Sequence, residues 1–112
     1  MLTTIELFKC LADETRLRCL ALLRNNGSLC VCELTCALAL SQPKISRHLS
    51  LLRQSDIVRD NRKGQWVYYE LNPVLPNWAE AILVIALQQL IEQGGLQADS
   101  ERLHAMAGRS CV

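Results

Sequence analysis

The first forty residues alternate between apolar stripes at helical spacing and short polar breaks. One stripe recurs every three or four positions from Leu2 to Leu11, which predicts a helix. A second stripe follows Asp13, a residue type that caps helix N-termini, and stops at Asn25-Asn26-Gly27, which tolerates a left-handed backbone. The segment 28–31 reads as a short extended link, and residues 32–40 as a short third helix.

A fourth helix begins at Ser41, because serine is a good N-cap and Pro43 is tolerated in a first turn. Apolar residues recur at i, i+4 and i+7 from Ile45, so this helix has one buried stripe. The polar and cationic residues between them point largely elsewhere, at the start of the helix. These residues are Gln42, Lys44, Ser46, Arg47 and His48.

Two strand-like runs, 57–60 and 65–71, flank a turn that ends at Gly64, which predicts a β-hairpin with Arg62 and Lys63 at its tip. A long helix is expected over 77–93, and its apolar residues surround most of its circumference. Such a helix must be covered on more than one face. A second copy of the chain, with the first helix contributing, is the expected cover.

This order of elements, helices followed by a basic hairpin and a last helix, describes a winged helix-turn-helix, mainly α with a small β-hairpin. We expect a DNA-binding and dimerisation domain over 1–95, forming a homodimer through its first and last helices. A polar C-terminal tail, 96–112, follows, with at most a short helix near 101–106. No apolar run approaches the roughly 20 residues that cross a bilayer, and no secretory signal is visible, so a cytoplasmic protein without membrane contact is expected.

Charge is unevenly distributed along the 112 residues, although the formal net charge is only +1. Residues 41–66 hold six basic and two acidic side chains, whereas both flanking regions are neutral or acidic. A basic middle segment favours a local polyanion-binding surface. Side chains on the fourth helix suit base edges in a major groove, while Arg62 and Lys63 suit phosphates or a minor groove. We therefore expect double-stranded operator DNA as a partner.

Six cysteines are unusual in a chain of this length, and in a reducing compartment they are expected to be thiols. Cys30, Cys32 and Cys36 fall within seven residues. Trivalent arsenic and antimony are soft and take three thiolates, so these cysteines are a candidate metalloid site. Cys10 and Cys19 lie on apolar stripes and are interpreted as buried hydrophobes. Cys111 lies in the tail and is left unassigned.

Residues 2–92 resemble the ArsR/SmtB family, and within it the arsenic-responsive repressors. The resemblance is carried by three segments, 29–34, 41–49 and 64–69. The resemblance implies a homodimeric winged-helix repressor that leaves its operator when a metal or metalloid binds. Cys30 and Cys32 match the pattern of those repressors. Cys36 departs from it by one residue, since the third cysteine of the pattern falls at Thr35. No constitutive cofactor is implied, and As(III) or Sb(III) would be the inducer.

Helix geometry bears on the departure at Cys36. Cys32 and Cys36 are i and i+4 and share a helix face, with Cβ atoms roughly 5–6 Å apart. Cys30 can join them only if the chain is extended before Cys32. The hypothesis is a site of Cys30, Cys32 and Cys36 completed by a small distortion of the first turn. Drawing the sulfurs together would move this helix, and the recognition helix with it.

The sequence also bears on other functions. The predicted last helix has no histidine, so a zinc site of the kind found on that helix in other family members is not expected. Soft divalent metals such as cadmium or lead stay open, with Cys10 as an additional ligand. A thiol-redox switch at Cys30, Cys32 and Cys36 is a further alternative. An enzyme is not expected, because the chain shows no phosphate loop, paired-carboxylate motif or Ser/His/Asp order.

Overall fold

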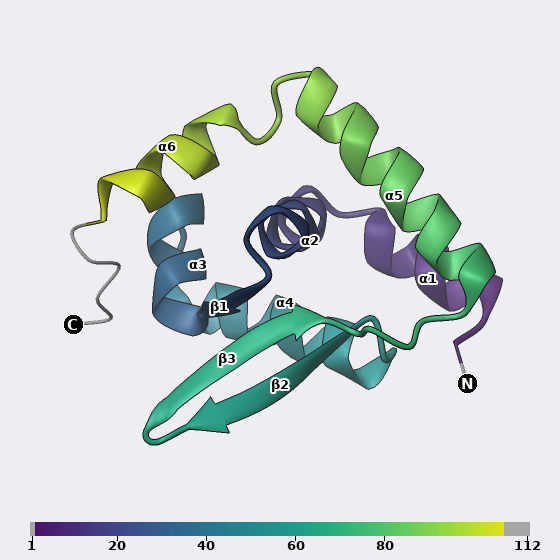
Figure 1. Ribbon diagram of the computed structural model, residues 1–112, viewed down its shortest axis with the longest axis horizontal. Helices are drawn as coiled ribbons and strands as arrows, with labels where there is room; N and C mark the ends of the chain where they lie inside the picture. The colour runs from purple at the N-terminus through teal and green to yellow at the C-terminus, as the bar shows by residue number, and fades with distance from the viewer. Residues whose placement is uncertain (1, 107–112) are drawn as a thin grey trace.

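A computed structural model of the chain describes residues 2–106, and Figure 1 shows their arrangement. The chain is mainly helical with a small antiparallel sheet, which confirms the predicted fold class. No helix in this range is long and apolar enough to cross a membrane. The elements are α1 (Thr4–Leu11), α2 (Glu14–Asn26), β1 (Ser28–Cys30), α3 (Val31–Leu38), α4 (Gln42–Gln54), β2 (Val58–Lys63), β3 (Trp66–Leu71), α5 (Asn77–Glu92) and α6 (Gln97–Ala105).

Local signals explain where several of the helices begin. Thr3 and Glu6 form a capping box before α1, with 3.1 and 3.2 Å hydrogen bonds in the two directions. The Asp13 carboxylate accepts the backbone N–H of Arg16 at 3.1 Å, and Ser41 Oγ accepts that of Lys44 at 3.4 Å. Because these caps satisfy N–H groups that have no partner within the helix, they fix the starts of α2 and α4.

Helix α2 is the centre of the core and is seen nearly end-on in Figure 1, with the other helices around it. Five consecutive residues of α2, Cys19 to Leu23, are at most 1% exposed, so every face of this stretch is covered. α4 contributes the stripe predicted from its sequence, in which Ile45, Leu49 and Leu52 are fully buried. This packing fixes α4 against α2 and leaves the opposite face of α4 available for contacts.

The sheet has the order β1-β3-β2 and is antiparallel throughout. The β2–β3 hairpin confirms the predicted wing, and Gly64 at its turn has φ +64°, which glycine adopts without strain. The segment expected as an extended link is a true strand, in which Leu29 pairs with Tyr69. This strand ties the start of α3 to the middle of β3, where Cys30 pairs with Tyr68.

Helices α1 and α5 lie on the same side of the molecule in Figure 1, and both keep large apolar side chains exposed. α5 buries Leu83 and Leu87, yet Ile85 is 71% exposed. On α1, Ile5 is 64% and Phe8 is 51% exposed. The first and last helices of the predicted domain therefore leave apolar surface uncovered in the single chain.

Residues 96–106, expected as a polar tail with a short helix near 101–106, contain a longer and packed helix. These residues form α6, which packs against α3, and both Leu96 and Leu103 are buried. The seven-residue spacing of the two leucines places them on one helix face, a signal that the sequence carried. Cys111 lies outside the described residues.

Candidate nucleic-acid interface and thiol site

The N-terminal half of α4 presents an exposed polar surface. Gln42, Lys44 and Arg47 are exposed, and Ser46 is half-buried. They surround the first turns of a helix whose opposite face is anchored in the core. A helix held in this way has the form of a recognition helix, whose first turns meet base edges in a major groove.

His48 does not belong to that surface, and the expectation that it points outward with its neighbours is wrong. Its side chain is buried, and its Nδ1 lies 3.2 Å from Nη1 of Arg16 on α2. Burial lowers the pKa of this imidazole from its ordinary value, with Arg16 adding to the effect and Asp13 opposing it. Since position 48 is i+3 from Ile45, it lies on the flank of the buried stripe.

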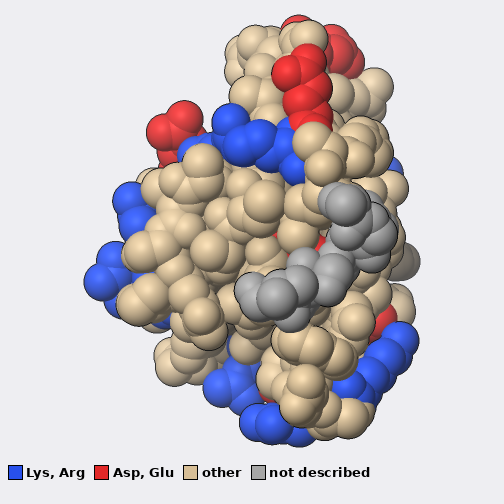
Figure 2. All heavy atoms as spheres, turned by 90° about the vertical axis from the view of Figure 1, so that its left-hand side faces the viewer, with Lys and Arg blue, Asp and Glu red and all other residues tan. Residues whose placement is uncertain are grey.

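The tip of the wing is basic and solvent-exposed. Arg62 and Lys63 are both exposed at the end of β2, and the Lys63 ammonium lies 5.2 Å from the centroid of the Tyr68 ring. Figure 2 shows Lys and Arg side chains at the lower end of the molecule, where the hairpin lies in Figure 1, and also along one side and near the top. The two basic residues of the wing tip are therefore available to a polyanion.

The three neighbouring cysteines lie at the start and along the surface of α3. Cys30 is the N-cap residue, 1% exposed, with an extended backbone, as the hypothesis of a three-cysteine site required. Its backbone N–H donates to Oε1 of Glu33 at 2.9 Å. Cys32 is half-buried and Cys36 is exposed. Within residues 2–106 no three His, Cys, Asp or Glu side chains converge as a metal site, so a three-thiolate site requires rearrangement.

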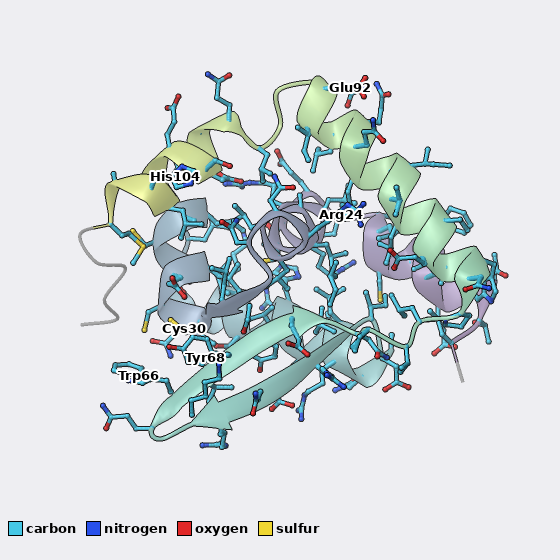
Figure 3. The ribbon with its side chains drawn as sticks, in the orientation of Figure 1. Arg24, Cys30, Trp66, Tyr68, Glu92 and His104 are labelled. Atoms are coloured by element: carbon cyan, nitrogen blue, oxygen red, sulfur yellow. The ribbon has the colours of Figure 1, made fainter. Side chains whose placement is uncertain are left out.

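A hollow of about 210 Å³ lies beside two of these cysteines. It connects the cysteine-bearing segment with the first residue of α4 and with the wing. In Figure 3, Cys30 lies beside Tyr68, its pairing partner on β3, and near Trp66, which pairs with Lys63 next to the turn. The residues that line the hollow are Cys30, Val31, Cys32, Gln42, Gln65, Trp66 and Val67. Sequence reasoning missed the wing residues here, since their approach to Cys30 depends on the β1–β3 pairing.

Cys10 and Cys19 are both buried, as predicted from their apolar stripes. Burial raises the pKa of Cys19 to about 12, so this thiol stays protonated at neutral pH. The Cys10 Sγ lies 3.5 Å from Oγ of Ser55. Neither position has the features of a reactive, metal-binding thiol.

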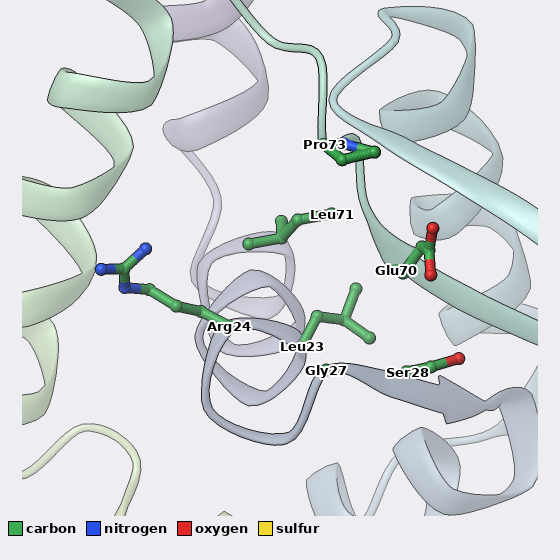
Figure 4. Close-up of a pocket in the computed structure, with 7 residues that line it drawn as sticks. All are labelled: Leu23, Arg24, Gly27, Ser28, Glu70, Leu71 and Pro73. Atoms are coloured by element: carbon green, nitrogen blue, oxygen red, sulfur yellow. The ribbon is translucent and has the colours of Figure 1, made fainter. Parts of the chain in front are cut away.

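A second hollow, of about 450 Å³, is open to solvent between α2 and the sheet (Figure 4). Arg24 at its edge also approaches Glu80 of α5, at 3.6 Å. Its lining residues are Leu23, Arg24, Gly27, Ser28, Glu70, Leu71 and Pro73. Among the residues that the structure describes, no cysteine or histidine lines it, so it lacks the chemistry of the thiol segment.

A core-anchored helix with a polar outer face, a preceding short helix and a basic hairpin define a winged helix-turn-helix protein of the DNA-binding class. The family of bacterial regulatory proteins termed arsR matches residues 13–60. The arsenic resistance transcriptional regulator ArsR1 of Pseudomonas putida is 52% identical over 109 residues, covering 97% of this chain and 84% of that protein. The chain therefore belongs to the ArsR family, as the sequence resemblance indicated.

Two further relatives are informative. The arsenical resistance operon repressor of Escherichia coli is 56% identical over 82 residues, covering 73% of this chain and 70% of the repressor. Among solved structures, the antimony-specific transcriptional repressor AntR has a TM-score of 0.66 and 31% identity, covering 80% of this chain and 78% of that chain. The fold is thus shared with solved transcriptional regulators.

Proposed function

We propose that this protein is a metalloid-responsive transcriptional repressor that binds operator DNA as a homodimer and is released when As(III) or Sb(III) binds cysteine thiolates. One observation carries the proposal: the cysteine-bearing helix α3 ends only three residues before Ser41, the N-cap of the recognition helix. The names of the relatives in P. putida and E. coli and of AntR support this class of inducer. The protein would act in the cytoplasm.

The proposed DNA contacts divide between base edges and the phosphate backbone. Gln42, Lys44, Ser46 and Arg47 on α4 would enter the major groove, since amide, hydroxyl and cationic groups pair with base edges there. Arg62 and Lys63 at the wing tip would contact flanking phosphates or the minor groove. The buried His48 would support α4 from behind rather than contact DNA. Two copies of this surface would meet half-sites about 34–36 Å apart.

The proposed inducer site consists of Cys30, Cys32 and Cys36. Trivalent arsenic bound by three thiolates forms a compact pyramid, so the first turn of α3 must distort to bring the sulfurs together. The hollow beside Cys30 and Cys32 provides space for that distortion, and Gln42 at its wall is the first residue of α4. Movement at the thiols would therefore reach the recognition helix directly.

The test is release from promoter DNA, measured by fluorescence anisotropy with protein whose thiols are fully reduced by a phosphine. Arsenite and antimonite are expected to weaken operator affinity at least about fivefold, a typical allosteric coupling. Cys32→Ser should bind the operator with normal affinity and ignore arsenite, because the central thiolate is lost. Cys10→Ser, outside the proposed site, is the matched control and should respond like the wild type.

Unchanged operator affinity in arsenite would refute the proposed function. Cadmium and peroxide, added in the same assay, separate the alternatives of soft divalent metal sensing and thiol oxidation. Cys36→Ser tests the third ligand: a response equal to that of the wild type would remove Cys36 from the site.

A further inference from the structure

A buried ion cluster connects α6 to the end of α3. Asp99 of α6 is 2% exposed, and its carboxylate accepts two hydrogen bonds from Arg18 of α2, at 2.7 and 2.8 Å. Arg102 donates a third to the same carboxylate, at 2.8 Å. Charge-assisted bonds of this length are among the stronger hydrogen bonds in proteins. One carboxylate thus orients two guanidinium groups.

Both guanidinium groups also bind the C-terminal carbonyls of α3. Arg102 Nε donates to the carbonyl of Ala37 at 2.7 Å, and Arg18 Nη2 donates to that of Leu38 at 3.0 Å. The last four carbonyls of a helix have no N–H donor within the helix, so they must accept hydrogen bonds from other groups. Here the carbonyls of Thr35 and Cys36 accept the backbone N–H groups of Leu40 and Ala39, and the two arginines satisfy the other two.

The end of α3 held by the two arginines is also the start of the connection to α4. Ala39 takes a left-handed backbone with φ +57°, and Ser41 already caps the recognition helix. α3 has no basic residue of its own in its last turn. Its C-terminal end is therefore fixed by side chains from α2 and α6, while its N-terminal end carries two of the three proposed inducer thiols, Cys30 and Cys32.

We propose that Asp99, Arg18 and Arg102, the α3 clamp, are positioning residues for operator binding and for its response to the inducer, an inference that rests on the proposed function. They hold the end of α3 that leads into α4, so that a distortion at the cysteines is transmitted along the helix to the α3–α4 connection instead of being lost in its last turn. Without the α3 clamp, the C-terminal end of α3 is free to move, so the N-terminus of α4 is no longer held in position for DNA. A distortion at the thiols then moves the end of α3 without moving α4.

The test compares Asp99→Asn with Glu101→Gln, the same carboxylate-to-amide change at an exposed position of α6. Asp99→Asn is expected to weaken operator affinity without arsenite about tenfold and to reduce the arsenite-induced affinity ratio at least about threefold. Arsenite binding itself, followed by thiolate-to-arsenic absorbance, should not change. Amide hydrogen exchange at residues 39–41 should accelerate. A merely stabilising ion cluster would lower the melting temperature without changing the affinity ratio of the folded protein.

Arg102→Lys is the second variant, because this side chain is 40% exposed and its replacement threatens folding less. It keeps a positive charge near Asp99 but cannot bind Asp99 and Ala37 in the same geometry. Folded variants with wild-type operator affinity, affinity ratio and exchange at residues 39–41 would overturn the proposal. If arsenite does not release the wild-type protein from DNA, the proposed function fails. The α3 clamp is then tested only by amide hydrogen exchange at residues 39–41 and by operator affinity without arsenite.

Discussion

His48 shows how a single residue can belong to the recognition helix and yet face away from DNA. Its neighbours Lys44 and Arg47 are exposed, whereas its ring is enclosed between α4 and α2, where Nδ1 faces Arg16. Arg16 in turn donates to the carbonyls of Cys10 and Lys9, at 2.7 and 3.0 Å. A neutral imidazole therefore fits this position, since a protonated one would face a guanidinium at hydrogen-bond distance.

We predict that His48 makes the free energy of unfolding fall as the pH drops below about 6.5, the ordinary imidazole pKa. The folded-state pKa is lowered, so the unfolded chain binds the proton more readily, and acid favours unfolding. The stabilising contribution of the neutral His48 ring is complete above its pKa in the unfolded chain. It is lost as the pH falls through its pKa in the folded protein. Urea unfolding between about pH 5 and pH 7.5 measures the slope. His48→Gln should flatten it, and the exposed His104→Gln should not; equal slopes for both variants would contradict the prediction.

The sequence predicted those helices and strands whose determining residues lie close together in the chain. Helices α1, α2 and α4 follow from apolar spacing and from caps that lie within a few residues. Strand β1 was not predicted as a strand, because its pairing partner β3 lies about forty residues further along the chain. The burial of Asp99 escaped for the same reason, since Arg18 is 81 positions away in sequence. Of the proposed thiol site, the sequence predicted the extended backbone at Cys30, which the structure has, but not the wing beside it; the ligand set of Cys30, Cys32 and Cys36 stays a prediction.

The wing is an element whose contribution to binding can be measured through salt. We predict that replacing Arg62 and Lys63 by alanine weakens operator and unrelated DNA alike, because binding to phosphates carries little sequence information. The slope of log affinity against log salt should fall by about 0.9 for each phosphate that the variant no longer neutralises. Arg24→Ala is the control, since it removes a basic side chain that pairs with Glu80 on another element. A wing variant with an unchanged salt slope would place the hairpin away from DNA.

Of the exposed large apolar side chains, Ile5 and Phe8 lie on α1 and Trp78, Ile85 and Ile91 on α5, two helices that lie away from the wing in Figure 1. Apolar exposure shared by two neighbouring helices is a candidate interaction site. A second copy packed there would add its own recognition helix at a fixed distance from the first. Operator affinity would then depend on both copies binding DNA together. A shift of α4 in each copy would weaken the contacts at both half-sites.

We predict that Ile85→Glu, which places a charge on this surface, converts the protein to a monomer, because a buried unpaired carboxylate strongly disfavours association. Loss of the linked second half-site should weaken operator affinity at least about 100-fold. Sedimentation equilibrium measures the first effect and anisotropy the second. Val74→Glu introduces the same charge at a residue that is 78% exposed between β3 and α5, and should leave both unchanged. A dimeric Ile85→Glu protein with full operator affinity would mean that the apolar surface of α1 and α5 is not what pairs the recognition helices.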